Sequence, residues 1–170
     1  MATTQVRIAG FGGQGVVLAG VLLGRAALEE GLHAIQNQSY GAEARGGAAR
    51  SEVIVASEPI VYPEVTAPDI LAALSQAGAD RYLPDLRPGG TLIADAELVA
   101  NLPALQDCRL LRASFTRVAA EELGRQIVAN IVMLGFLVGA TGLVGADSAR
   151  RAVEQGVPRG TEELNLRALE

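Results

Sequence analysis

The chain has 170 residues, which is enough for one domain, and we expect residues 1–170 to form a single unit around one core. Its formal net charge is −5, so it lacks the basic surface that binding to nucleic acid or to an anionic membrane requires. A single cysteine, Cys108, excludes an internal disulfide and any zinc site or iron-sulfur cluster ligated by four cysteines of this chain. Because no basic and apolar leader precedes the first strand, these features predict a cytoplasmic protein in a reducing compartment.

The first third of the chain predicts a strand, a tight turn and a helix. Residues 5–9 form an apolar run typical of a buried parallel strand, a cluster of glycines follows, and a helix is expected from residue 16 to a stop at Gly31. Residues 33–36 predict a second strand that closes a β-α-β unit. Residues 37–50 show no regular period, so we expect a long surface loop there.

Strands and helices alternate through the rest of the chain. Four further strands are expected, at residues 51–57, 69–74, 89–98 and 109–113. Helices are expected at residues 75–86, 117–124, 127–144 and 146–156, the last one capped by Asp147 or Ser148. This alternation predicts an α/β fold: a single three-layer α/β/α domain with a Rossmann-like, mainly parallel sheet.

One segment resembles a membrane span at first sight. Residues 127–144 contain no charged side chain, but they include Asn130, Thr141 and three glycines, and 18 residues are short for a span. A helix that is apolar nearly all round is more often buried, here under other helices or under a partner subunit. We therefore expect no membrane partner.

The glycine cluster in "RIAGFGGQGVVLAG" is the first candidate site. Gly10, Gly12 and Gly15 match the dinucleotide pattern G-x-G-x-x-G between a strand and a helix, with Gly13 and Gln14 at the open positions. Small residues there let a phosphate approach the N–H groups at the start of a helix. The alternative is that these glycines only permit a tight turn and close packing of the helix on the sheet.

A nicotinamide dinucleotide fits the pattern poorly. The acidic side chain that holds the ribose is expected about 20 residues past the glycines, where this chain has Gln36, Asn37 and Gln38. No Gly-Lys-Ser/Thr follows the glycines either, so the turn is not a Walker P-loop. An independent nucleotide-binding module or a small dinucleotide-dependent oxidoreductase remains the alternative function.

Three motifs in order resemble a known family. "GFGGQGVVLAGVLLGRAALEEG", "SYGAEARGGAARSEVIVA" and "VANIVMLGFLVGATGLV" are similar to segments of the gamma subunit of the thiamine-diphosphate-dependent 2-oxoacid:ferredoxin (acceptor) oxidoreductases. This family includes the pyruvate, ketoisovalerate and 2-oxoglutarate enzymes. The resemblance extends from about residue 6 to about residue 153.

The resemblance implies a subunit that is not catalytic on its own. The family converts a 2-oxoacid, coenzyme A and oxidised ferredoxin to an acyl-CoA, carbon dioxide and reduced ferredoxin. Its thiamine diphosphate, magnesium and iron-sulfur clusters are expected on the alpha and beta subunits or on a ferredoxin-like delta subunit. The gamma subunit is expected to bind these partners, to help the complex assemble and to shape the channel for coenzyme A or the oxoacid. The sequence does not identify the oxoacid.

The second candidate site is the family's Ser-Tyr-Gly-x-x-x-Arg-Gly-Gly segment. It matches here at Ser39, Tyr40, Gly41, Arg45, Gly46 and Gly47. A guanidinium binds carboxylates and phosphates through several donors, and glycines let another backbone approach closely. We expect this segment and the glycine turn to face the catalytic subunits together, near the entry of coenzyme A. An inter-subunit salt bridge from Arg45 is an equally weighted alternative.

Two side chains outside these motifs have mainly structural interpretations. Asn130 lies in an apolar helix, and because a buried amide needs partners, it either fixes a loop or reaches an interface, with the structural role favoured. His33, the only histidine, is expected to be partly buried and not catalytic.

Overall fold

The computed structural model describes residues 3–39 and 48–170. Six strands form one sheet in the order β2-β3-β1-β4-β5-β6, and the fold is α/β as predicted. The strands are β1 (Thr4–Phe11), β2 (His33–Ser39), β3 (Ala48–Ala56), β4 (Ile70–Ala73), β5 (Thr91–Asp95) and β6 (Arg109–Ala113). The α-helices are α1 (Val16–Glu29), α2 (Gln76–Tyr82), α3 (Phe115–Glu121), α4 (Ala129–Thr141), α5 (Ala146–Gly156) and α6 (Glu162–Leu169). Two short 3₁₀ helices, η2 (Leu83–Asp85) and η3 (Gln126–Val128), complete the elements.

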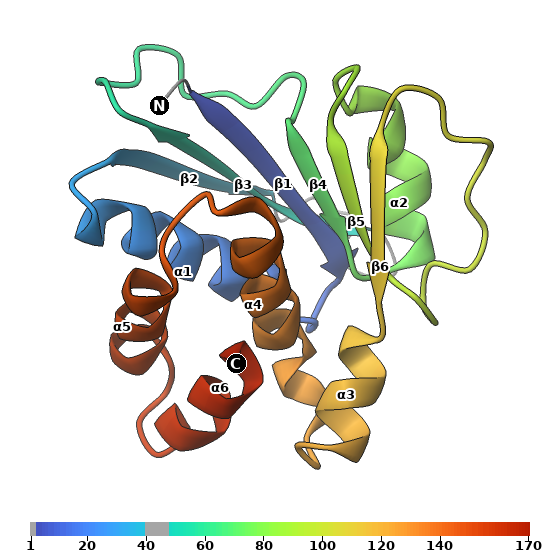
Figure 1. The fold of residues 1–170 in the computed structure, drawn as a ribbon. Helices are drawn as coiled ribbons and strands as arrows, with labels where there is room; N and C mark the ends of the chain where they lie inside the picture. Colours follow the sequence, from blue (N-terminus) through green and yellow to red (C-terminus); the bar gives the residue numbers. More distant parts are fainter. Residues whose placement is uncertain (1–2, 40–47) are drawn as a thin grey trace.

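The sheet is mainly parallel, as predicted, with one strand that makes it mixed. β1, β4, β5 and β6 are parallel neighbours, but β3 runs antiparallel to both β1 and β2. The helix α1 therefore does not connect two adjacent strands, because β3 is inserted between β1 and β2 (Figure 1). The loop predicted over residues 37–50 is too long at both ends, since β2 continues to Ser39 and β3 begins at Ala48.

Alternation along β1 divides the core between the two faces of the sheet. Val6 and Ile8 belong to the larger apolar cluster, which α1 and α4 cover, whereas Ala9 belongs to the smaller cluster beneath α2. In the helix α1, Gly20 lies so close to β3 that an added Cβ would be 2.0 Å from the Ser51 hydroxyl. The missing side chain thus brings the helix directly onto the sheet.

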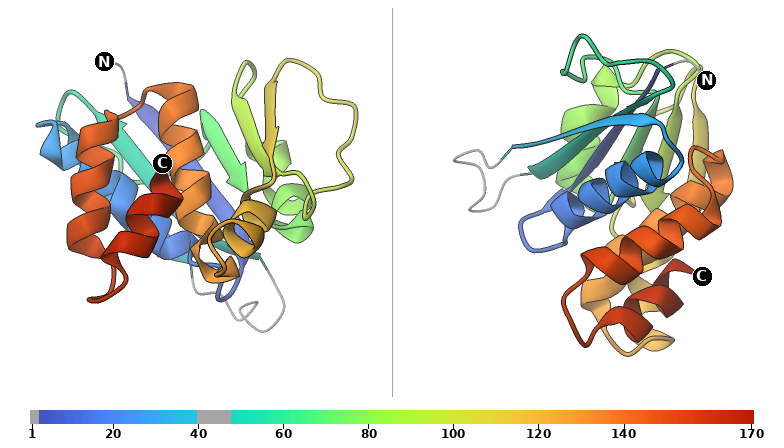
Figure 2. Two further views of the ribbon diagram at one scale, coloured as in Figure 1. Left: turned by 60° about the horizontal axis from the view of Figure 1, so that its bottom comes forward. Right: turned by 90° about the vertical axis from the view of Figure 1, so that its left-hand side faces the viewer.

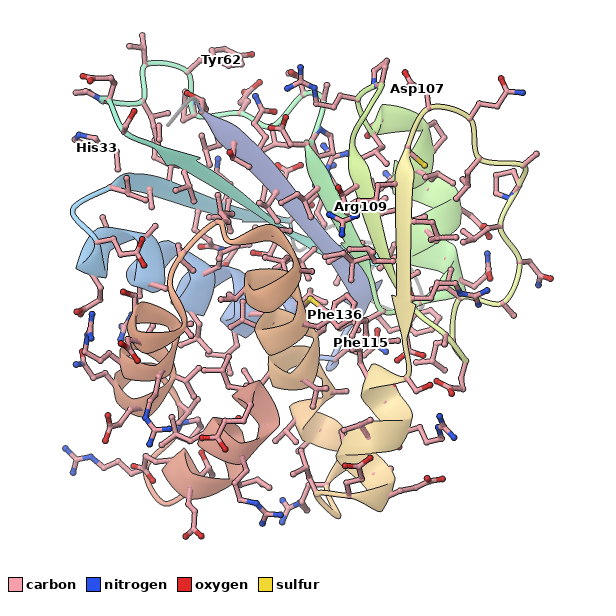
Figure 3. The ribbon with its side chains drawn as sticks, viewed as in Figure 1. His33, Tyr62, Asp107, Arg109, Phe115 and Phe136 are labelled. Atoms are coloured by element: carbon pink, nitrogen blue, oxygen red, sulfur yellow. The ribbon has the colours of Figure 1, made fainter. Side chains whose placement is uncertain are left out.

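The C-terminal half forms the helical side of the molecule. Figure 2 shows α1 and α4 next to the sheet, with α5 and α6 beyond them, while α2 covers the opposite face. Phe115 at the start of α3 meets Phe136 of α4 edge to face, with ring centroids 5.3 Å apart (Figure 3). Gly135 admits α6, because a Cβ there would be 2.0 Å from the Leu169 carbonyl oxygen. The apolar helix α4 is therefore buried under this chain's own helices.

Two details of this half differ from the sequence predictions. Helix α5 begins after Gly145, and neither Asp147 nor Ser148 caps it. The uncharged run at residues 127–144 holds only the 13-residue α4 as an α-helix. Within the described ranges, no helix has both the length and the apolar character to cross a membrane.

Candidate functional site

The glycine turn joins the end of β1 to the start of α1, and Gln14 organises it. The Gln14 N–H donates to the Phe11 carbonyl at 3.1 Å, and the Gln14 side-chain oxygen accepts the Phe11 N–H at 2.6 Å. The Gln14 amide also donates to the Leu74 carbonyl at 2.9 Å. Gly10 must lack a side chain here, since a Cβ would be 2.5 Å from the Gln14 oxygen. Gln14 therefore fastens the turn to the end of β4.

The last two glycines of the turn have different surroundings. Gly13 and Gly15 both have positive φ, at 92° and 73°. Among residues 3–39 and 48–170, nothing lies within 4 Å of a Cβ placed at Gly13, so these residues leave this part of the turn open. At Gly15 a Cβ would be 2.4 Å from the Asn130 amide nitrogen, which donates to the Gly15 carbonyl at 3.0 Å. Asn130 is 3% exposed, so the predicted role of fixing a loop is confirmed.

The turn borders a small cavity at the ends of the neighbouring strands β1 and β4. After β1 the chain continues toward β2 on one side of the sheet, and after β4 it continues toward β5 on the other side. In α/β sheets such a switch point is the usual place for a ligand. The cavity measures about 220 Å³ and is lined by Gly13, Gln14, Leu74, Thr116, Gln126, Ile127 and Ala129. Pockets that enclose a whole cofactor or drug-sized molecule measure roughly 300–1,000 Å³. This cavity is therefore large enough for one end of a ligand or a partner side chain, but not for an entire dinucleotide or coenzyme.

The strand order also argues against a dinucleotide in the usual pose. In that arrangement the strand bearing the ribose-binding acid lies beside the first strand. Here β3 separates β2 from β1, and two of the three amides at positions 36–38 of β2 are already bonded. Gln36 donates to the Ser51 hydroxyl at 2.9 Å, and Asn37 donates to the Pro63 carbonyl at 2.5 Å. The geometry thus weakens the alternative of an independent dinucleotide-binding module.

Of the second candidate segment, the structure describes only Ser39. Its other members lie outside the described residues: Tyr40, Gly41, Arg45, Gly46 and Gly47. Ser39 pairs with Arg50 at the end of β2, and Ala48, where β3 begins, pairs with Phe11 at the end of β1. The two ends of the segment therefore lie at the end of the sheet that carries the glycine turn; the strands predicted at residues 33–36 and 51–57 were too short to place them there.

Sequence reasoning did not identify a buried ionic cluster on the α2 face of the sheet. Arg7 is 3% exposed; its Nε donates to Glu52 at 2.7 Å, and its guanidinium also contacts Asp85. It further donates to the Val65 carbonyl at 3.0 Å and lies 5.1 Å from the centre of the Tyr82 ring. The sequence signal that could have indicated this cluster is the charged Arg7 in the middle of an otherwise apolar strand. The cluster joins β1, β3 and η2.

Asp95, at the end of β5, was also missed. It is fully buried, and one carboxylate oxygen accepts the N–H groups of Glu97 and Leu98, both at 3.0 Å. The other oxygen accepts the Thr116 N–H at 2.9 Å, in the first turn of α3. The sequence signal that could have indicated it is an acidic residue at the end of an apolar strand. Its bonds hold the turn after β5 and the start of α3, so we assign it a structural role.

The remaining polar candidates lie away from the glycine turn. Figure 3 shows His33 at the outer end of β2, where it is exposed and not partly buried as expected. Tyr62 is exposed in the connector before β4, and its hydrogen bond to Glu64, followed by the charge of that carboxylate, raises the pKa of the phenol. Within residues 3–39 and 48–170, no three histidine, cysteine or acidic side chains form a group that could hold a metal.

Fold and site together define an α/β domain with a glycine turn at a switch point and with no reactive constellation assembled beside that turn among the described residues. The comparisons with known proteins agree: a family model described as pyruvate ferredoxin/flavodoxin oxidoreductase matches residues 5–170, and the chain belongs to this family. The resemblance to gamma subunits of 2-oxoacid:ferredoxin oxidoreductases is therefore confirmed, and the chain is a subunit of an oxidoreductase.

Individual relatives sharpen this assignment. The 2-oxoglutarate synthase subunit KorC of Methanocaldococcus jannaschii is 50% identical over 167 residues, which cover 96% of this chain and 89% of that protein. The pyruvate synthase subunit PorC of Methanothermobacter marburgensis is 30% identical over 167 residues, covering 96% and 92%. The crystal structure of the keto/oxoacid ferredoxin oxidoreductase gamma subunit from Geobacter sulfurreducens superposes with a TM-score of 0.88 at 42% identity, covering 98% of this chain and 94% of that one.

Proposed function

We propose that this chain is the gamma subunit of a complex that oxidises 2-oxoglutarate. The observation that supports this substrate is the difference in identity between two relatives of similar coverage, 50% for the 2-oxoglutarate synthase subunit against 30% for the pyruvate synthase subunit. The complex converts 2-oxoglutarate, coenzyme A and oxidised ferredoxin to the acyl-CoA, carbon dioxide and reduced ferredoxin. We further propose that residues 1–170 act as one domain within it.

The chain's contribution is to hold and shape a site whose reactive groups lie on other subunits. Thiamine diphosphate, magnesium and the iron-sulfur clusters belong, in this proposal, to alpha and beta subunits or to a ferredoxin-like delta subunit. The glycine turn supports this proposal, because the side-chain amides of Gln14 and Asn130 form hydrogen bonds to the backbone that hold the turn in place. The cytoplasmic location predicted from the sequence stays a prediction.

The glycine turn and the segment between β2 and β3 form the surface that we assign to coenzyme A and the catalytic subunits. The turn fits the phosphate end of coenzyme A in three respects: Gly13 is open, the first-turn N–H groups of α1 have no acceptor within the helix, and no acidic residue lies in that turn. With about 220 Å³ beside it, the turn takes only part of the coenzyme, and partner chains enclose the rest.

The test is the kinetics of the assembled complex with the variant Gly13→Ala. A methyl group at Gly13 meets none of the described residues, so an effect beyond the conformational cost of the positive φ reports what else approaches the turn in the complex. We expect the KM for coenzyme A to rise severalfold while the KM for 2-oxoglutarate stays unchanged. The control is Gly31→Ala, which also has a positive φ and open space but lies at the other end of α1.

Two outcomes would contradict this assignment of the site. Equal KM values for coenzyme A in the two variants would reduce the glycine turn to a structural element. Loss of assembly with unchanged coenzyme A kinetics in the remaining complex would identify it as a contact to a partner subunit alone. Arg45→Ala, in the segment beyond Ser39, separates the same alternatives, because a salt bridge to a partner affects assembly and a phosphate contact affects the KM for coenzyme A.

A further inference from the structure

The connector between β3 and β4, residues 57–69, presents apolar side chains to solvent. It contains no helix or strand, and connectors of about this length are usually functional. Val61 is 95% exposed, more than any other exposed large apolar side chain that the structure describes, and Tyr62 is 62% exposed. These two residues are called the Val61–Tyr62 tip. Because Val55, just before the connector, pairs with Thr4, the tip lies at the end of the sheet remote from the glycine turn (Figure 1).

The chain holds this tip in place instead of letting it fold back onto the core. The Pro63 carbonyl accepts the Asn37 side-chain amide at 2.5 Å, and the Val65 carbonyl accepts the Arg7 guanidinium at 3.0 Å. Val65 is itself 6% exposed, so the connector returns to the core just after the tip. Pro59 and Pro63 restrict the backbone on both sides. An apolar group that is already ordered loses little conformational entropy when a partner covers it.

Acidic side chains alone supply the charge around the tip. Glu58 and Glu64 are exposed on either side of it, and residues 57–69 contain no lysine, arginine or histidine. Neither carboxylate forms an ion pair with another residue in the described ranges. The Tyr62 hydroxyl donates to Glu64 at 2.8 Å, which holds the ring and this carboxylate together. Figure 3 shows Tyr62 at the outer end of the molecule. A partner complementary to the tip therefore combines an apolar pocket with positive charge.

We propose that the Val61–Tyr62 tip docks into an apolar pocket on another subunit of the complex, where lysine or arginine side chains pair with Glu58 and Glu64. This inference rests on the proposed function, in which the chain works within a hetero-oligomer. A second copy of this chain fits the tip poorly, because its net charge is also −5 and two facing tips would bring like carboxylates together. The tip and the glycine turn lie at opposite ends of the sheet, so the chain contacts the complex at two separate places.

The affinity of this chain for the remaining subunits tests the apolar part of the contact. Dilution of the assembled complex, with a fluorescent label on this chain, gives the Kd from the anisotropy. Tyr62→Ala should raise the Kd about tenfold or more, as truncation of an interfacial aromatic anchor does. Tyr62→Phe keeps the ring and should bind nearly as tightly as the wild type. The matched control is Leu110→Ala, which truncates a side chain that is 40% exposed on β6 and should leave the Kd unchanged.

The salt dependence of the same Kd tests the charged part. Glu58→Gln combined with Glu64→Gln should weaken binding and make it less sensitive to salt, because fewer charge pairs remain to be screened. Glu163→Gln removes an exposed carboxylate on α6 and should change neither quantity. An unchanged Kd for Tyr62→Ala, an equal loss for Leu110→Ala, or tighter binding after removal of the two carboxylates would overturn the proposal.

A photo-crosslinker on the tip identifies its occupant in the purified complex. Val61→Cys is introduced together with Cys108→Ser, so that a maleimide-benzophenone reacts with the only thiol in the chain. Irradiation should link this chain to one other subunit, at apolar residues with lysine or arginine beside them. Linkage to a second copy of this chain, or to no subunit, would overturn the proposal. A complex that prefers pyruvate would contradict the proposed substrate and leave this inference intact, whereas unchanged binding by Tyr62→Ala contradicts this inference alone.

Discussion

The glycine turn is held from outside by Asn130, and the variant Gly15→Ala measures how strongly. An alanine at a left-handed position costs roughly 1–2 kcal/mol in backbone strain. At Gly15 the methyl group would also lie 2.4 Å from the Asn130 amide nitrogen and displace it from the Gly15 carbonyl. Because Asn130 is 3% exposed, its unsatisfied amide costs about 1–3 kcal/mol more. We therefore expect a loss of about 2–5 kcal/mol in the free energy of unfolding.

Urea denaturation of a small set of variants tests this reasoning. Gly13→Ala is the control, because Gly13 has a similar φ but open space, and it should lose only about 1–2 kcal/mol. In an Asn130→Ala background, Gly15→Ala should cost no more than Gly13→Ala does, so the double mutant is less destabilised than the sum of its parts. Equal losses for Gly13→Ala and Gly15→Ala in the wild-type background would refute the role of Asn130, as would strict additivity.

Two further predictions concern the core. Gly20→Ala should destabilise the fold by about 1–3 kcal/mol, because its Cβ would lie 2.0 Å from the Ser51 hydroxyl. Gly24→Ala, whose Cβ would have no atom closer than 3.9 Å, should be neutral or stabilise the fold by up to about 1 kcal/mol through helix propensity. Thermal melting of both variants checks the sign of each change. Arg7→Met leaves the nearly buried Glu52 without its main partner and should cost about 3–5 kcal/mol, while Arg7→Met combined with Glu52→Leu should recover most of that loss in urea denaturation. A double variant as unstable as the single one would contradict this assignment of the ionic pair.

The sequence predicted the six strands and the helices α1 to α5, because their local signals agree with the tertiary structure, but it did not predict α6. The apolar run of β1, the stop at Gly31 and the strand at Arg109–Ala113 all lie where the pattern placed them. It did not predict that β3 inserts antiparallel between β1 and β2. Strand direction depends on which edges pair, and an apolar run shows that β3 is buried but does not show which strands lie beside it.

The candidate site likewise has features that the sequence predicted and features that it did not. The glycine turn was predictable because G-x-G-x-x-G between a strand and a helix has a local mechanism. Its fastening was not predictable in detail, since Gln14 reaches Leu74 and Asn130 reaches Gly15 across 60 and 115 positions of the chain. Arg7 escaped notice because its partners come from three separate segments, none of which shows a motif.

Ferredoxin reduction by the purified complex, assembled with and without this chain, is the most direct measurement. With the chain present, reduction that depends on both 2-oxoglutarate and coenzyme A is expected, with kcat/KM for 2-oxoglutarate well above that for pyruvate, and the chain alone should reduce no ferredoxin. Turnover by the isolated chain, or a complex that prefers pyruvate, would contradict the proposed function.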